Sequence, residues 1–148
     1  MLIRGAIFLA ENFVFSDNTI GKKLLALLNN PTSDAPYFLV KTTSQQHTKP
    51  KTPGCIENYY QAYFIHANGD FFEKDTWIQL DDYFPFDPSD VKAKLKHIGQ
   101  LTPKTTDSIV KCFLKIKEQD LSPRILNYLS PPIEQGLQAL ATKFNNRL

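Results

Sequence analysis

The chain has 148 residues, of which 42% are hydrophobic and 22% charged, a composition that is typical of one soluble globular domain and excludes a disordered chain. Its formal net charge of +2 permits binding to an anion such as nucleic acid but does not require it. The two cysteines, Cys55 and Cys112, form no C-x-x-C pair. We therefore expect two reduced thiols rather than a disulfide framework or a zinc site.

The first residues, MLIRGAIFLAEN, do not resemble a signal peptide, because Arg4 and Glu11 interrupt the apolar run and no small-residue cleavage site follows. No apolar stretch approaches the ~20 residues that a membrane-spanning helix needs. We expect a cytoplasmic protein that does not enter a membrane.

Residues 1–86 are predicted to form a β-sheet core. Apolar and aromatic runs alternate with turn signals such as Asn29-Asn30-Pro31 and Asn68-Gly69-Asp70. The predicted strands lie in the segments LIRGAIFLA, KKLLALLN, PYFLVKTT, ENYYQAYFIHA and FFEKDTWIQLDDYF, and QQHTKPKTPGC is a predicted loop. The leucine-rich KKLLALL has helical propensity, but its short length and flanking turns favour a strand. The near-continuous apolar character predicts a small, highly curved sheet or barrel that is buried on much of both faces. Of the two, we expect the curved antiparallel barrel.

Residues 87–148 are predicted to form a helical extension of the same domain, which makes the whole chain, 1–148, one α+β domain. The first predicted helix has Asp87 as N-cap and Pro88 at its first position, and it ends at Gly99. A second helix begins at Thr102-Pro103, and the segment RILNYL forms a short helical turn.

A last helix is expected after Ser130-Pro131, with an apolar stripe that is either core or a partner-binding face. The stripe consists of Ile133, Leu137, Leu140, Ala141 and Phe144.

Cations and hydroxyl groups are predicted at the ends of two successive strands. Asp17, Lys22 and Lys23 precede the apolar run of the second strand, and Thr42, Thr43, Ser44 and Gln45 close the third. If these strands are neighbours, ammonium and hydroxyl groups converge and can bind a phosphate and stabilise charge on it. The alternative is that the lysines are solvated and that TTSQ is a plain turn.

The order of these motifs resembles the MazF/PemK family of toxin endoribonucleases. The resemblance rests on Arg4-Gly5-Ala6-Ile7-Phe8, Gly21-Lys22-Lys23-Leu24 and Thr42-Thr43-Ser44-Gln45, and it covers roughly residues 2–83. It implies an SH3-like barrel, a homodimer and metal-independent cleavage of single-stranded RNA without a cofactor. In that family the RNA 2′-hydroxyl attacks the adjacent phosphorus, and the cleavage leaves a 2′,3′-cyclic phosphate.

The family's catalytic arginine falls on Lys23 and its threonine on Thr43, with Ser44 beside it. Lysine replaces the planar, bidentate guanidinium with a point charge, and Leu24 stands where the family has proline. Asp17 is our candidate for the base, by its position in the loop. Lys22 and Gln45, with His47, Lys49 and Lys51 in the following loop, are candidate RNA-binding residues.

The remaining histidines, His66 and His97, are expected to have structural rather than catalytic roles. The aromatic residues Tyr59, Tyr60, Tyr63 and Phe64 are able to stack on bases, but strand alternation places most of them in the core.

Two classes of function remain open, beside a weaker third interpretation as a plain structural or scaffold domain. One is an endoribonuclease toxin that a cognate antitoxin protein restrains. The other is a non-catalytic protein on the same fold, either a gyrase-poison-like toxin or an RNA-binding or protein-binding adaptor.

Overall fold

The computed structural model describes residues 2–32, 35–45 and 49–129. The expectations for His47 and for the last helix, with its stripe from Ile133 to Phe144, lie outside the described residues. Within them the protein is α+β, with one seven-stranded antiparallel sheet and three α-helices. No described helix has the length and apolar character needed to cross a membrane.

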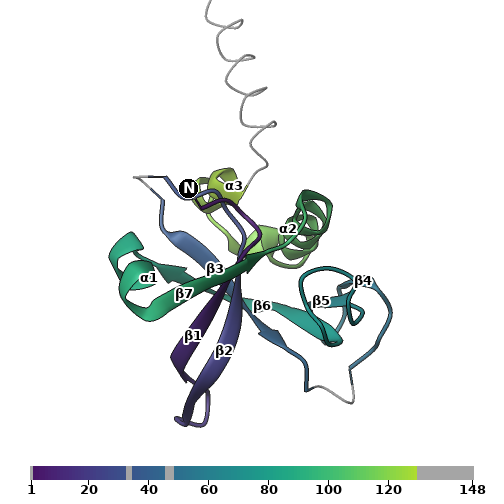
Figure 1. The fold of residues 1–148 in the computed structure, drawn as a ribbon. Helices are drawn as coiled ribbons and strands as arrows, with labels where there is room; N and C mark the ends of the chain where they lie inside the picture. The colour runs from purple at the N-terminus through teal and green to yellow at the C-terminus, as the bar shows by residue number, and fades with distance from the viewer. Residues whose placement is uncertain (1, 33–34, 46–48, 130–148) are drawn as a thin grey trace, which may run out of the picture.

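The strands run in the spatial order β4-β5-β6-β3-β2-β1-β7 (Figure 1). Their bounds are β1 (Ala6–Val14), β2 (Ile20–Leu27), β3 (Tyr37–Thr43), β4 (Gly54–Ile56), β5 (Ala62–Ile65), β6 (Thr76–Phe86) and β7 (Leu95–Gln100). The helices are α1 (Pro88–Lys94), α2 (Pro103–Lys117) and α3 (Pro123–Leu129), with a 3₁₀ turn, η1 (Glu118–Asp120), between the last two.

The segment KKLLALL forms a strand, as predicted, because its side chains are buried on both faces of the sheet. Leu25 and Leu27 pack in a cluster with Val91 of α1. Ala26 and Leu28 pack on the opposite face, in a larger cluster that also contains residues of α2 and α3. A strand between two apolar layers accommodates such a continuous apolar run. Figure 1 shows α1 lying apart from α2 and α3.

The sheet is not closed into a barrel, contrary to the prediction. β4 and β7 are the two outer strands and do not pair with one another. β4 has three residues, in a segment predicted to be loop, and it pairs with β5 along one edge. Helix α2 packs against β4, β5 and β6.

The prediction of one helix ending at Gly99 was wrong in its second half. Helix α1 ends at Lys94, and the backbone at Leu95 is extended. Residues Leu95–Gln100 then pair with Ala6–Ala10 of β1 as β7. This pairing satisfies the backbone groups along an edge of β1, and unpaired backbone groups in a buried strand are costly.

The prediction of two reduced thiols was also wrong, because Cys55 and Cys112 form a disulfide. Cys55 is exposed on β4, and Cys112 is buried on the apolar face of α2. The two cysteines are 57 residues apart in the chain, so no local sequence pattern indicates that they meet. They meet because α2 packs on β4. Disulfides persist mainly in oxidising compartments, so this pairing does not support the expectation of a cytoplasmic protein.

Candidate functional site

A cleft of about 510 Å³ opens where β2 and β3 separate. The two strands pair over Leu25–Leu27 and Leu39–Lys41. Beyond this point β2 continues beside β1, and β3 continues beside β6. In Figure 1, β1 and β2 leave the centre of the sheet in one direction, and β6 leaves it with β5 and β4 in another.

The Thr42 side chain closes the base of the cleft. Its hydroxyl donates a 3.0 Å hydrogen bond to the Leu24 carbonyl oxygen, and its side chain is buried. The hydroxyl therefore satisfies a backbone acceptor in the position where the ladder between β2 and β3 has ended.

The cleft brings together the two predicted groups of polar residues. Its walls include residues 22–24 from β2 and residues 42–45 from the end of β3. Lys22 and Lys23 point to opposite faces of β2, and both line the cleft because the neighbouring strand has moved away. Ammonium and hydroxyl groups from the two strands therefore line one cleft.

The opposite wall comes from elements that the sequence did not point to. It consists of residues 71–74, Thr76 at the start of β6, and Ile98 of β7. Phe15, at the hairpin between β1 and β2, also lines the cleft but lies on the β2 side, beside Gly21 and Lys23. Gly99 explains how Phe71 reaches this wall, because a Cβ atom at Gly99 would lie 2.2 Å from the Phe71 ring. Glu73 is the one carboxylate among the described lining residues.

Lys23 is the central cation of the site. Burial, together with the charges of Lys41 and Lys49, lowers its pKa below the usual 10.5. Its ammonium group lies 5.8 Å from the centre of the Phe15 ring, a cation–π contact. Among the described residues Lys23 has no ion pair with a carboxylate, so its charge is available to an anion.

The hydroxyl groups at the end of β3 differ in their availability. The Thr43 hydroxyl oxygen accepts a long bond from the Gln45 amide (3.4 Å), and the hydroxyl donates to no acceptor among the described residues. Ser44 and Gln45 are exposed. These groups are therefore able to donate to the oxygens of a phosphate in the cleft.

Asp17 does not line the cleft. Its carboxylate lies in the turn between β1 and β2, where it accepts hydrogen bonds from the Thr19 hydroxyl (2.6 Å) and amide (3.0 Å). These bonds lower the pKa of Asp17. A carboxylate with a lowered pKa and a local structural role is a weaker base.

The loop lysines have different surroundings. Lys49 lies near enough to Lys23 to lower its pKa. Burial and the charge of Lys41 lower the pKa of Lys49, against the opposing effect of Asp81. Lys51 instead forms an ion pair with Asp75 (3.4 Å) and is not among the described residues that line the cleft.

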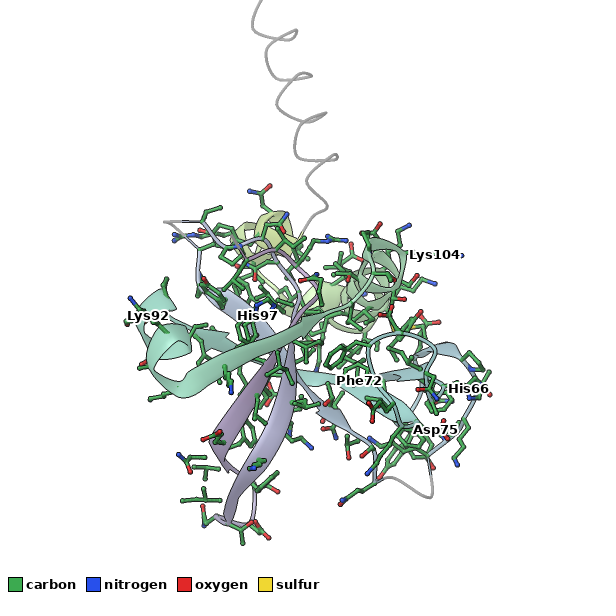
Figure 2. The ribbon with its side chains drawn as sticks, viewed as in Figure 1. His66, Phe72, Asp75, Lys92, His97 and Lys104 are labelled. Atoms are coloured by element: carbon green, nitrogen blue, oxygen red, sulfur yellow. A yellow bond between two sulfur atoms is a disulfide. The ribbon has the colours of Figure 1, made fainter. Side chains whose placement is uncertain are left out.

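The two described histidines lie in local structural contacts. His66 faces Asp75 across 3.9 Å (Figure 2), and its ring makes an edge-to-face contact with Phe64. A ring nitrogen of His97 lies 2.8 Å from the Gly99 carbonyl oxygen. Among the described residues, no three His, Cys, Asp or Glu side chains gather to form a metal site.

Comparison with known proteins adds no relative: neither a protein-family model nor a curated protein matches the sequence.

Proposed function

We propose that the protein is an endoribonuclease of the MazF/PemK type that cleaves single-stranded RNA without a metal ion. The observation that carries the proposal is the meeting of Lys23 and Thr43 in one cleft, at the point where β2 and β3 separate. We further propose that the open sheet is a variant of the SH3-like barrel of that family.

In the proposed reaction, the scissile phosphate occupies the cleft between Lys23 and the end of β3. The ammonium groups of Lys22 and Lys23 stabilise the charge that develops on the phosphate oxygens, and the Thr43 and Ser44 hydroxyls hold those oxygens. Lysine contributes charge without the bidentate geometry of arginine, and the second lysine compensates for part of that difference.

Glu73 replaces Asp17 as our candidate for the general base, because it lies on the cleft wall. It removes the proton from the RNA 2′-hydroxyl, whose oxygen then forms a bond to phosphorus. The bond from phosphorus to the 5′-oxygen breaks, and that oxygen takes a proton from water. The products are a 2′,3′-cyclic phosphate and a free 5′-hydroxyl.

The remaining parts of the proposal concern partners. An endoribonuclease toxin requires restraint by a cognate antitoxin, and the family resemblance implies a homodimer. A small acidic protein encoded beside this one that binds the chain and blocks its cleft is the expected antitoxin.

The test is incubation of the purified protein with single-stranded RNA in EDTA, followed by typing of the product ends. We expect discrete cuts with cyclic phosphates, and loss of cleavage in Lys23→Ala and Thr43→Val. Lys92→Ala and Lys104→Ala are matched controls, because these lysines are exposed on α1 and α2, outside the cleft (Figure 2).

Folded protein that leaves all tested RNAs intact would reject the enzymatic proposal. If that protein still binds RNA or a protein partner, the non-catalytic alternative replaces it. Full cleavage by Lys23→Ala would also reject the assignment of the site, whatever the products.

A further inference from the structure

A row of aromatic rings lies on the sheet face that carries Leu25 and α1. The Phe13 ring lies 5.5 Å from that of Phe15 and 5.8 Å from that of Phe84, with edge-to-face geometry in both pairs. Phe84 belongs to this face because it is the partner of Leu39, which packs with Leu25. All three rings are half-buried, so part of each is accessible.

Lysine side chains accompany these rings. The Lys23 ammonium lies 5.8 Å from the centre of the Phe15 ring, and the Lys41 ammonium lies 5.6 Å from that of Phe84. Lys41 is opposite Leu25 in the ladder, two residues along β2 from Lys23. We call Phe13, Phe15, Phe84, Lys23, Lys41 and Lys49 the aromatic-lysine strip.

The positive charges of the strip are close together and largely uncompensated. The charges of Lys41 and Lys49 act on Lys23, and that of Lys41 acts on Lys49. Among the described residues none of the three forms an ion pair, and Asp81 is the carboxylate that acts on Lys49. Half-buried like charges repel one another, so a bound polyanion would relieve this repulsion.

The combination of charge and rings selects among polyanions. A single-stranded nucleic acid presents phosphates to lysines and base faces to aromatic rings, and both contacts are used by proteins that bind single strands. A duplex hides its base faces, and a sulfated polysaccharide has none. The alternation of rings and cations along one face therefore fits a single strand best.

Lys23 connects the strip to the cleft, because it belongs to both. A strand whose phosphate lies beside Lys23 in the cleft would pass next to Phe15 and reach Lys41 and Phe84 on the same face. The cleft and the strip are thus two consecutive parts of one path.

We propose that the aromatic-lysine strip is a second binding stretch for single-stranded RNA, which holds the nucleotides next to the one in the cleft. Lys41 and Lys49 contact phosphates, and Phe84 and Phe13 stack on bases. The inference depends on the proposed function for the identity of the strand in the cleft, but binding along the strip does not require cleavage.

The test measures fluorescence anisotropy of labelled 2′-O-methyl RNA, which lacks the attacking hydroxyl and stays intact. We expect Phe84→Leu to raise Kd about tenfold, the loss of roughly one stacked base. Lys41→Gln is expected to raise Kd at low salt and to reduce the slope of log K against log salt by about 0.7, the value for one phosphate contact on a single strand. Lys104→Gln is the matched control and should bind as the native protein does.

RNA oligonucleotides of increasing length test whether the strip binds the nucleotides that extend beyond the cleft. Short RNA that fills the cleft alone should bind both strip variants like the native protein, and longer RNA should bind them more weakly. Circular dichroism of each variant checks folding. Lys41→Gln keeps the test decisive if Phe84→Leu is unstable, because it leaves the Phe84 ring in place and Lys41 forms no ion pair with a described residue.

Native affinity for long RNA in Lys41→Gln would overturn the inference. It would also be overturned if duplex RNA or heparin bound as tightly as the single strand and Phe84→Leu had no effect, since the strip would then be a general polyanion surface. Weakened binding in both strip variants, in a protein that cuts no RNA, would support the strip and reject the proposed cleavage. Unchanged binding in both strip variants, in a protein that cuts RNA, would reject the strip and support the proposed cleavage.

Discussion

The Thr42 hydroxyl donates a hydrogen bond to the carbonyl oxygen of Leu24, across 3.0 Å, at the position where the ladder between β2 and β3 ends. The next residue, Thr43, lines the same cleft but donates no hydrogen bond to a described residue. Adjacent threonines thus have separate tasks: Thr42 ties β3 to β2 at the base of the cleft, and Thr43 faces what enters it.

This difference predicts opposite effects for two otherwise similar substitutions. Thr42→Val keeps the shape of the side chain but leaves the Leu24 carbonyl without its donor, so the free energy of unfolding should fall by about 1–2 kcal/mol. Thr43→Val should change it by less than about 0.5 kcal/mol, while it abolishes or strongly reduces RNA cleavage. Urea unfolding and a cleavage assay on the same preparations measure both effects. Equal stability losses in the two variants would contradict this division of tasks.

The disulfide between Cys55 and Cys112 is predicted to stabilise the fold substantially. It closes a loop across a separation of 57 residues, and a loop of that size is expected to raise the free energy of unfolding by about 3–4 kcal/mol. Urea unfolding with and without a reductant measures the difference. The double variant Cys55→Ala, Cys112→Ala should be insensitive to the reductant. A native protein that titrates with two free thiols under non-reducing conditions would contradict the pairing.

Much of the candidate site was predictable because it depends on neighbouring strands. The apolar runs around Leu25 and Leu39 predict two successive strands, and antiparallel pairing of the two places Lys23 and Thr43 at the same end. What the sequence did not indicate is that β2 and β3 part there. This separation depends on the pairing of β2 with β1 and of β3 with β6. No local sequence pattern encodes these pairings.

The segment from Leu95 to Gln100 shows why local patterns failed elsewhere. Val91, Leu95 and Ile98 have helical spacing, so the pattern predicted one continuous helix. The pairing of this segment with β1 outweighs that preference, and it places Ile98 in the cleft wall. Similarly, Cys55 and Cys112 meet because α2 packs on β4, a tertiary contact between segments far apart in the chain.

Asp70 is predicted to make stability sensitive to acid. Burial alone would raise its pKa, but hydrogen bonds from the Thr105 and Thr102 side chains and from the Phe71 and Thr102 amides lower it below the usual 3.8. A lowered carboxylate pKa adds stability above the unfolded value, and this stability disappears as the pH falls through the folded value. These bonds join the start of α2 to the segment that supplies Phe71 to the cleft.

The measurement is urea unfolding of the native protein and Asp70→Asn, from about pH 6 to about pH 2, the range that spans acid titration of carboxylates. At pH 6 the native protein should be more stable, and the two proteins should converge below pH 3.8. Thr102→Val, which removes one of the donors to Asp70 (2.8 Å), should show part of the same convergence. A constant difference at every pH would contradict the assignment.

Lys23 is predicted to set the alkaline limit of the proposed cleavage. Its pKa is lowered by burial and by the charges of Lys41 and Lys49, and the proposed reaction needs its positive charge. Activity should therefore fall as the pH rises through this lowered pKa. Lys23→Arg should keep part of the activity at neutral pH and lose the alkaline fall, because the guanidinium stays charged.

Lys49→Gln provides a second, independent check of the same limit. Removal of the Lys49 charge should raise the pKa of Lys23, so the alkaline fall in activity should move to higher pH. Initial rates across the pH range, corrected for hydrolysis of RNA without protein, measure both variants. If Lys23→Arg is as inactive as Lys23→Ala at every pH, a positive charge at this position does not suffice for activity. If Lys49→Gln leaves the alkaline limit unmoved, a group other than Lys23 sets it.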